Sequence, residues 1–211
     1  MSASSSPTPE PQDVHPLVAE PTAVRGTISS VAFESGDRFV VGNWHRSPVG
    51  RLVDVMWVTT DGTRRLLVND ERAAEFITSI YAFDEVHVAP LTVDGDATHT
   101  HVSGHGLQLS MTAGRRRPIP FPRPRWVTRW VEAPIARRLM GVETYGVSPT
   151  GVREWYQSRG WSWITEASGT LDGVDLGEVV PIRKPVGVGF SDPPERPSIV
   201  TVHVAIHPPE R

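Results

Sequence analysis

The chain has 211 residues, of which 38% are hydrophobic, so it can bury a core in one large domain or two small ones. It contains no cysteine, which excludes disulfides, thiolate metal ligands and cysteine nucleophiles and fits a cytoplasmic protein. The formal net charge is −3, and no apolar run approaches the roughly 18 residues that a membrane-spanning helix needs, so we expect no transmembrane segment.

Residues 1–23 are rich in Ser, Pro and acidic side chains. They lack the basic and apolar stretches of a secretory signal peptide. A segment of this composition buries too little apolar surface to offset the entropy lost on ordering. We therefore expect a disordered tail at 1–23, followed by a single β-rich domain over residues 24–207.

Three Asp-Gly pairs organise the predicted strands. Asp61-Gly62, Asp94-Gly95 and Asp172-Gly173 each separate two strand-like runs, and Asp-Gly favours a two-residue type I′ turn because both residues need positive φ. The first turn leaves apolar side chains on both faces of its hairpin, so we expect a helix, a second sheet or the partner in a homodimer to cover it. Further strands are predicted at 26–33, 38–44, 105–112, 142–147, 151–157, 161–170, 186–190 and 198–206.

Two segments have the pattern of helices. The segment 69–83 begins with Asn69 or Asp70 as its N-cap and carries one apolar stripe, and the segment 123–140 repeats Trp and Val at helical spacing. Strands outnumber helices and hairpins dominate. The chain is therefore predicted to have an α+β fold, mostly antiparallel β: a barrel or half-barrel of hairpins with two packed helices, at about 69–83 and 123–140.

Three histidines, His99, His101 and His105, lie within seven residues. His99 and His101 share one face of a predicted strand, and such a pair with a third imidazole can hold a metal ion and leave one position open for water. With a turn at Asp94-Gly95, His87 points to the opposite face, so His105 is the candidate for the third ligand. The alternative is that these are half-exposed strand histidines near the end of a hairpin.

The most aromatic part of the chain lies between residues 146 and 169. Alternation places Arg153 and Trp155 on one strand face and Glu154 and Tyr156 on the other, and Trp161 and Trp163 share a face of the next strand. Aromatic side chains with a polar group line many ligand pockets, although the pattern also fits a Trp-rich core. The segment 41–55, which contains Gly42 and Trp44, is interpreted as an ordinary wide turn, and the alternative is a functional loop whose polar groups face a pocket.

The segment 115–138 contains eight arginines and one acid, Glu132. Such a segment could dock an acidic partner, or it could pair with the acidic remainder of the chain. The negative net charge and the lack of a known reader motif argue against nucleic acid.

No familiar catalytic motif is present, so whether the protein is an enzyme, and whether it uses a cofactor, stays open. The first hypothesis is a non-enzymatic protein that binds a small, partly apolar ligand. The aromatic side chains would form an apolar wall, and Arg153 and Glu154 would orient polar groups. The alternatives are a metal-dependent enzyme that uses His99 and His101, and an interaction protein that docks an acidic partner through 115–138.

Two runs carry a resemblance to known proteins. GDRFVVGNWHRSPVGRLVDVMW and WVTRWVEAPIARRLMGVETYGVSPTGVREWYQ resemble uncharacterised proteins of actinobacteria, which implies no activity. GVREWYQ, followed by the Gly-Thr-Leu-Asp-Gly turn, is loosely similar to lipocalin-like β-barrels.

Overall fold

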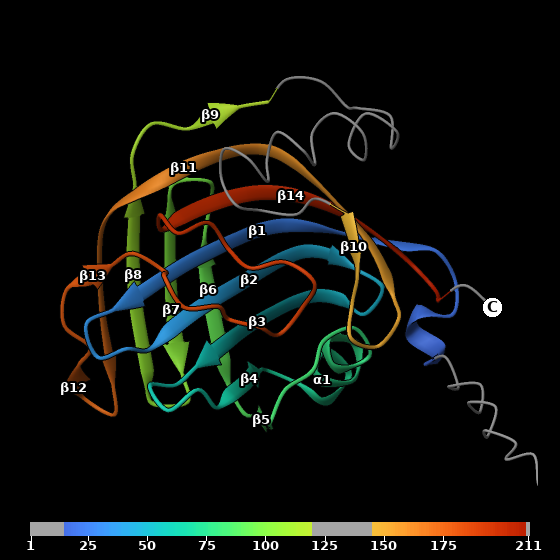
Figure 1. The fold of residues 1–211 in the computed structure, drawn as a ribbon, viewed down its shortest axis with the longest axis horizontal. Coiled ribbons are helices and arrows are strands. Elements are labelled where there is room, and N and C mark those ends of the chain that lie inside the picture. Colours follow the sequence, from blue (N-terminus) through green and yellow to red (C-terminus); the bar gives the residue numbers. More distant parts are fainter. Residues whose placement is uncertain (1–14, 120–144, 210–211) are drawn as a thin grey trace, which may run out of the picture.

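The structure is a computed structural model that describes residues 15–119 and 145–209 (Figure 1). The two helical elements in these ranges are a 3-10 helix, η1 (Pro16–Val18), and the α-helix α1 (Glu71–Thr78). The strands are β1 (Thr22–Phe33), β2 (Arg38–Ser47), β3 (Gly50–Val58), β4 (Arg64–Val68), β5 (Glu85–Val88), β6 (Leu91–Gly95), β7 (His99–Gly104), β8 (Leu107–Ala113), β9 (Arg117–Pro118), β10 (Tyr145–Val147), β11 (Arg153–Leu171), β12 (Val174–Asp175), β13 (Val179–Val180) and β14 (Ser198–His207).

The strands form one curved sheet in the order β5-β4-β3-β2-β1-β14-β11-β8-β7-β6. All neighbours are antiparallel except β4 and β5, which are parallel. The 19-residue β11 connects the two parts of the sheet, because its first half pairs with β14 and its second half with β8. In Figure 1, β11 runs along the top of the sheet and then bends down to join β8.

The sheet does not close into a barrel. Its edge strands among the described residues, β5 and β6, do not pair with each other. Instead β6, β7 and β8 cross behind β1, β2 and β3, and β6 packs on β2 and β3 (Figure 1). The prediction of a mostly antiparallel, β-rich fold is confirmed, and a closed barrel is wrong, because packing of one end of the sheet on its own face buries apolar surface without joining the edges.

Each face of the sheet contributes to a separate core. The back face packs on β6–β8 through large apolar side chains such as Phe39, Val55 and Leu67, which meet Leu109 and Met111. The front face packs on α1 and on the loop 181–197 between β13 and β14, which crosses the front of the sheet in Figure 1. The first predicted hairpin, β3–β4, is therefore covered on both sides by its own chain and needs no partner subunit for this purpose.

The three Asp-Gly pairs behave differently. Asp172-Gly173 forms the predicted two-residue turn, with φ of 49° and 80°. The turn at Asp61-Gly62 contains three residues, because Thr59 pairs with Thr63 and only Gly62 has positive φ. This extra residue shifts the β3–β4 register by one and places Leu66 beside Met56 rather than beside Trp57.

The second Asp-Gly pair lies inside a strand. Asp94 faces His101 and Gly95 faces Thr100, and the chain turns at residues 96–98, where the Asp96 carboxylate accepts from the backbone of Thr98 and His99. The pairing predicted from a turn at Asp94-Gly95 is therefore wrong. An Asp side chain that bonds the backbone two and three residues later specifies this turn better than the Asp-Gly pair does.

Of the two predicted helices, one is described. The segment 69–83 contains α1, and the expected stripe of Ala73, Phe76, Ile77 and Ile80 is buried. The segment 123–140 lies outside the described residues. No helix in the described ranges is long and apolar enough to cross a membrane.

Other boundaries also differ from the prediction. The predicted strands 151–157 and 161–170 are one strand, β11, and 186–190 belongs to the front loop. Within the predicted tail, Val18 is buried and β1 begins at Thr22, whereas 1–14 lie outside the described residues.

The N-terminus of α1 depends on one side chain. Asp70 has extended backbone geometry, and its carboxylate accepts from the Ala73 N–H at 2.9 Å. Asp70→Ala should lower the free energy of unfolding by about 1 kcal/mol, whereas Asp70→Asn should retain most of the stability because an amide oxygen also caps. Urea unfolding of the two variants checks this, and equal stability of both would contradict it.

Candidate ligand-binding cavity

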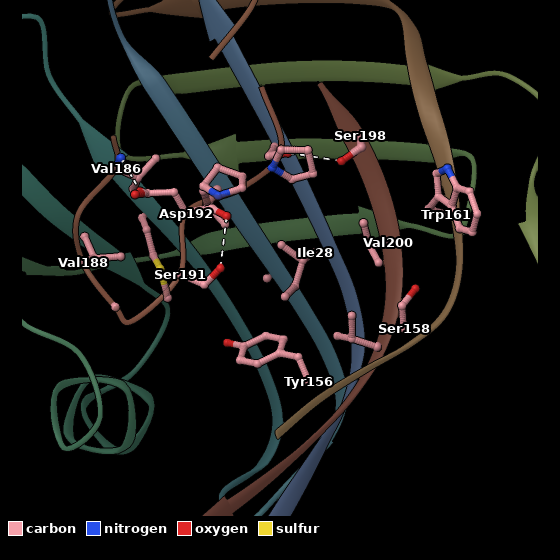
Figure 2. A pocket seen from close by; sticks show the side chains of 18 of the residues that line it. Ile28, Tyr156, Ser158, Trp161, Val186, Val188, Ser191, Asp192, Ser198 and Val200 are labelled. Carbon is pink, nitrogen blue, oxygen red and sulfur yellow. Dashed lines mark hydrogen bonds between the residues drawn. The ribbon is translucent and has the colours of Figure 1, made fainter. Parts of the chain in front are cut away.

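A cavity of about 200 Å³ lies between the front face of the sheet and the loop 181–197 (Figure 2). Its floor consists mostly of strand residues with apolar side chains, among them Ile28, Val40 and Val200, and it also contains Ser30, Ser158 and Ser198. Figure 2 shows Ile28 and Val200 on this floor between Tyr156 and Trp161. The loop forms the wall opposite the sheet. All of its residues from Val186 to Pro194 except Gly187 line the cavity.

The loop is held in place by backbone hydrogen bonds. The Asp192 carboxylate accepts from the N–H groups of Val186 and Gly187 at 2.7 and 2.9 Å, and this closes the loop into a tight turn. The Ala82 N–H donates to the Val188 carbonyl at 3.2 Å, which ties the loop to the segment after α1. The loop thus has a defined shape and is not a loose cover.

A β-bulge brings the aromatic side chains of β11 to the cavity. The pairing of β11 with β14 shifts by one residue between Ser158 and Gly160. A bulge inserts one residue and so reverses the alternation of side chains that follows. Tyr156 before the bulge and Trp161 and Trp163 after it therefore all line the cavity, although their spacing alone would place them on opposite faces.

One end of the cavity is polar. The indole N–H of Trp44 donates to Oδ1 of Asp54 at 2.8 Å, and the Asp54 side chain is almost fully buried, with 1% of its surface exposed. Its second oxygen, Oδ2, is buried and has no hydrogen-bond partner among the described residues. Gly42 leaves the room for this pair, because a Cβ there would lie 2.2 Å from Asp54 Oδ1 and 2.3 Å from Trp44 Nε1.

Two tyrosines connect this end of the cavity to a second buried acid. The Tyr81 hydroxyl donates to Oε2 of Glu154 at 2.6 Å and lies 2.6 Å from the Tyr156 hydroxyl. Because Tyr81 has one proton to donate, Tyr156 donates to Tyr81 in this arrangement. Oε1 of Glu154 is buried and has no hydrogen-bond partner among the described residues.

Burial dominates the electrostatics of these groups. It raises the pKa of Asp54 from 3.8 to about 7, against the opposing hydrogen bond from Trp44. It likewise raises the pKa of Glu154 from 4.5 to about 7, against the hydrogen bonds from the tyrosines. Burial and the neighbouring acids also raise the pKa of Tyr81 and Tyr156 well above 10, so both phenols are neutral at physiological pH.

The structure brings together only part of the predicted aromatic site. Tyr156, Trp161 and Trp163 line the cavity, and Glu154 reaches it through Tyr81. Trp155 and Arg153 do not line it. Trp155 lies on the opposite face of β11, where its ring is 4.8 Å from that of His207, and Arg153 donates to the Pro208 carbonyl.

The three clustered histidines do not converge. His99 and His101 share one face of β7, as predicted, but this face is exposed, and His99 lies 3.7 Å from the exposed Asp96. His105 lies in a two-residue turn with Gly106, and its Nε2 forms a hydrogen bond with the Ala89 carbonyl oxygen. Among the described residues, no group of three or more His, Asp or Glu side chains could hold a metal ion. The predicted Arg-rich segment 115–138 lies outside the described residues beyond Ile119.

Sequence reasoning did not identify Asp54, Tyr81 or the loop 181–197 as parts of a site. Asp54 is the one acid inside the apolar run LVDVMWV, and Trp44 lies two residues after Gly42 in β2. Their contact depends on the β2–β3 register, in which Gly42 faces Asp54. Tyr81 comes from a different part of the chain, and no local pattern connects it with Glu154.

No protein-family model matches the chain, and no curated protein or solved structure is significantly similar to it. The cavity and its side chains are therefore the basis on which a function can be argued.

The raised pKa of Asp54 predicts a pH-dependent stability. A carboxyl group whose pKa is higher in the folded than in the unfolded protein stabilises the fold when protonated, and this contribution is lost as the pH rises from about 4 to about 7. The free energy of unfolding of Asp54→Asn, relative to that of the wild type, should therefore increase by about 2 to 3 kcal/mol when the pH is raised from 5 to 8. Urea unfolding of both proteins at the two pH values measures this, and a difference that does not change with pH would contradict it.

Proposed function

We propose that the protein binds a small, largely apolar molecule in the cavity between the sheet and the loop 181–197. The observation that carries this proposal is the combination of a mostly apolar cavity with a few buried polar groups at one end. Ligand sites in proteins commonly have this composition, in which apolar walls provide affinity and a few polar groups fix the orientation. A closely packed core would fill such a space with side chains instead.

The dimensions of the cavity limit the ligand. An engineered apolar cavity of about 150 Å³ is large enough to bind benzene. The cavity described above, with about 200 Å³, suits a somewhat larger molecule, such as a benzene ring with a short polar chain. The ring would lie among Trp161, Trp163 and Val200, and the polar group would reach toward Asp54 and Tyr156.

The original hypothesis is modified in two respects. Trp44 and Tyr81 replace Trp155 as aromatic side chains near the ligand, and Asp54 takes the orienting role first given to Arg153. The loose lipocalin-like likeness points in the same direction, since it rests on the strand that carries Tyr156. A cytoplasmic location is part of this proposal and is supported by the absence of cysteine.

Filling the cavity should abolish binding. Val200 points into the cavity from β14 and is partly buried, so Val200→Phe would occupy the space of the ligand (Figure 2). We expect 2-phenylethanol, used as a probe, to bind the wild type and to bind Val200→Phe at least tenfold more weakly. Isothermal titration calorimetry measures both affinities.

The matched control is Val174→Phe. Val174 lies on β12 with 68% of its surface exposed and does not line the cavity, so the same substitution there should leave binding unchanged. Native mass spectrometry of the purified wild type provides a second readout, because a retained organic molecule should be absent from Val200→Phe. Equal binding of the probe by both variants, or no binding of any probe by the wild type, would contradict the proposed function.

A further inference from the structure

The acid at the polar end of the cavity lacks a counter-charge. Asp54 lines the cavity, its Oδ1 is engaged by Trp44, and its Oδ2 is buried without a partner among the described residues. An ionised carboxylate in an apolar site is costly unless an opposite charge or several hydrogen-bond donors compensate it. The protein provides one donor, so the free oxygen is available to a group of the ligand.

The charge of the lining is one-sided. The titratable residues that line the cavity in the described part of the chain are Asp54, Tyr81, Tyr156 and Asp192. Glu154 lies directly behind Tyr81. No described lysine, arginine or histidine lines the cavity, so a carboxylate or phosphate on the ligand would meet no positively charged side chain among the described lining residues.

The rest of the lining suits a cation. Trp44, which contacts Asp54, lines the polar end of the cavity, and the face of an indole ring attracts an ammonium group. A cation buried against this ring would still need an anionic partner. Asp54 satisfies that need, because one of its oxygens is free and no cationic side chain lines the cavity in the described part of the chain.

We propose that the ligand of this cavity is a small apolar amine whose protonated nitrogen pairs with the free oxygen of Asp54. This inference rests on the proposed function and specifies its ligand class. The ammonium group would neutralise Asp54 and approach the Tyr156 hydroxyl, which lies close enough to Asp54 for the two groups to interact electrostatically. The apolar part of the amine would extend along the floor of the cavity toward Trp161.

The main alternative is a neutral ligand with a carbonyl or hydroxyl oxygen. A protonated Asp54 would then donate a hydrogen bond to that oxygen. The two cases differ in how binding depends on charge and pH. An amine requires ionised Asp54 and should bind more weakly at acidic pH, whereas a neutral acceptor requires protonated Asp54 and should bind more tightly there.

The experiment compares three probes of nearly equal shape: 2-phenylethylamine, 2-phenylethanol and phenylacetate. At pH 8 the amine should bind at least tenfold more tightly than the alcohol, and phenylacetate should not bind. Because the pKa of Asp54 is about 7, the affinity for the amine should fall about tenfold between pH 8 and pH 6, while the affinity for the alcohol should not fall. Glu154 titrates over the same range, and Glu154→Gln should leave most of this pH dependence in place.

Asp54→Asn should remove the preference for the amine and leave the alcohol bound. The matched control is Asp37→Asn, because Asp37 also accepts a hydrogen bond from an indole N–H, that of Trp57 at 2.8 Å, but does not line the cavity. This variant should keep the preference. Should Asp54→Asn fail to fold, the pH dependence of amine binding by the wild type still tests the proposed pairing with Asp54.

Three results would overturn the inference: equal affinity for amine and alcohol, tighter binding of the amine at pH 6, or an unchanged preference in Asp54→Asn. In each of these the alcohol or the amine still binds, so the proposed function would stand. Failure of all three probes to bind would overturn both the ligand class and the proposed function.

Discussion

The 19 residues of β11 must satisfy two partners that run in different directions, β14 and β8. A regular strand of this length cannot follow both, so β11 contains two irregularities, between Ser158 and Gly160 and between Ile164 and Glu166. These bulges bend the sheet until β6–β8 lie against its back face. The first bulge also turns Trp161 and Trp163 to the front. The back core and the aromatic wall of the cavity therefore share one cause.

Two buried acids with raised pKa values are costly for a protein of this size. On the back face, Asp37, which accepts from the Trp57 indole N–H, lies in the turn just before β2 and has 8% of its surface exposed. On the front face, Asp54 lies in the middle of β3 with both neighbouring strands in place. Acids kept in such positions are common at functional sites, where the cost of burial is offset by what they bind. This is the physical reason for placing the site at Asp54.

The sequence predicted local features better than long-range ones. The N-cap of α1, its apolar stripe, the turn at Asp172-Gly173 and the β-rich composition follow from short segments, and the structure bears them out. The two other Asp-Gly pairs failed because a third loop residue in one and the Asp96 side chain in the other determine the register. The alternation within each half of β11 was predicted, but not that Tyr156 shares a face with Trp161 and Trp163, since a bulge leaves no clear mark in the sequence. Asp54, Tyr81 and the loop 181–197 come together only through the tertiary fold.

The two walls of the cavity differ in how firmly they are held. Strands with neighbours on both sides, and with side chains buried on both faces, form the floor. The loop is held to the rest of the chain by the buried side chains of Val186 and Val188 and by hydrogen bonds from Ala82 and Arg64. Local opening is easiest where few contacts must break, so the loop can detach while the sheet stays intact. Exchange of a bound molecule would then proceed at the rate of loop opening and not of global unfolding. The amide proton of Ala82, which bonds the Val188 carbonyl of the loop, reports that rate through its hydrogen exchange with solvent.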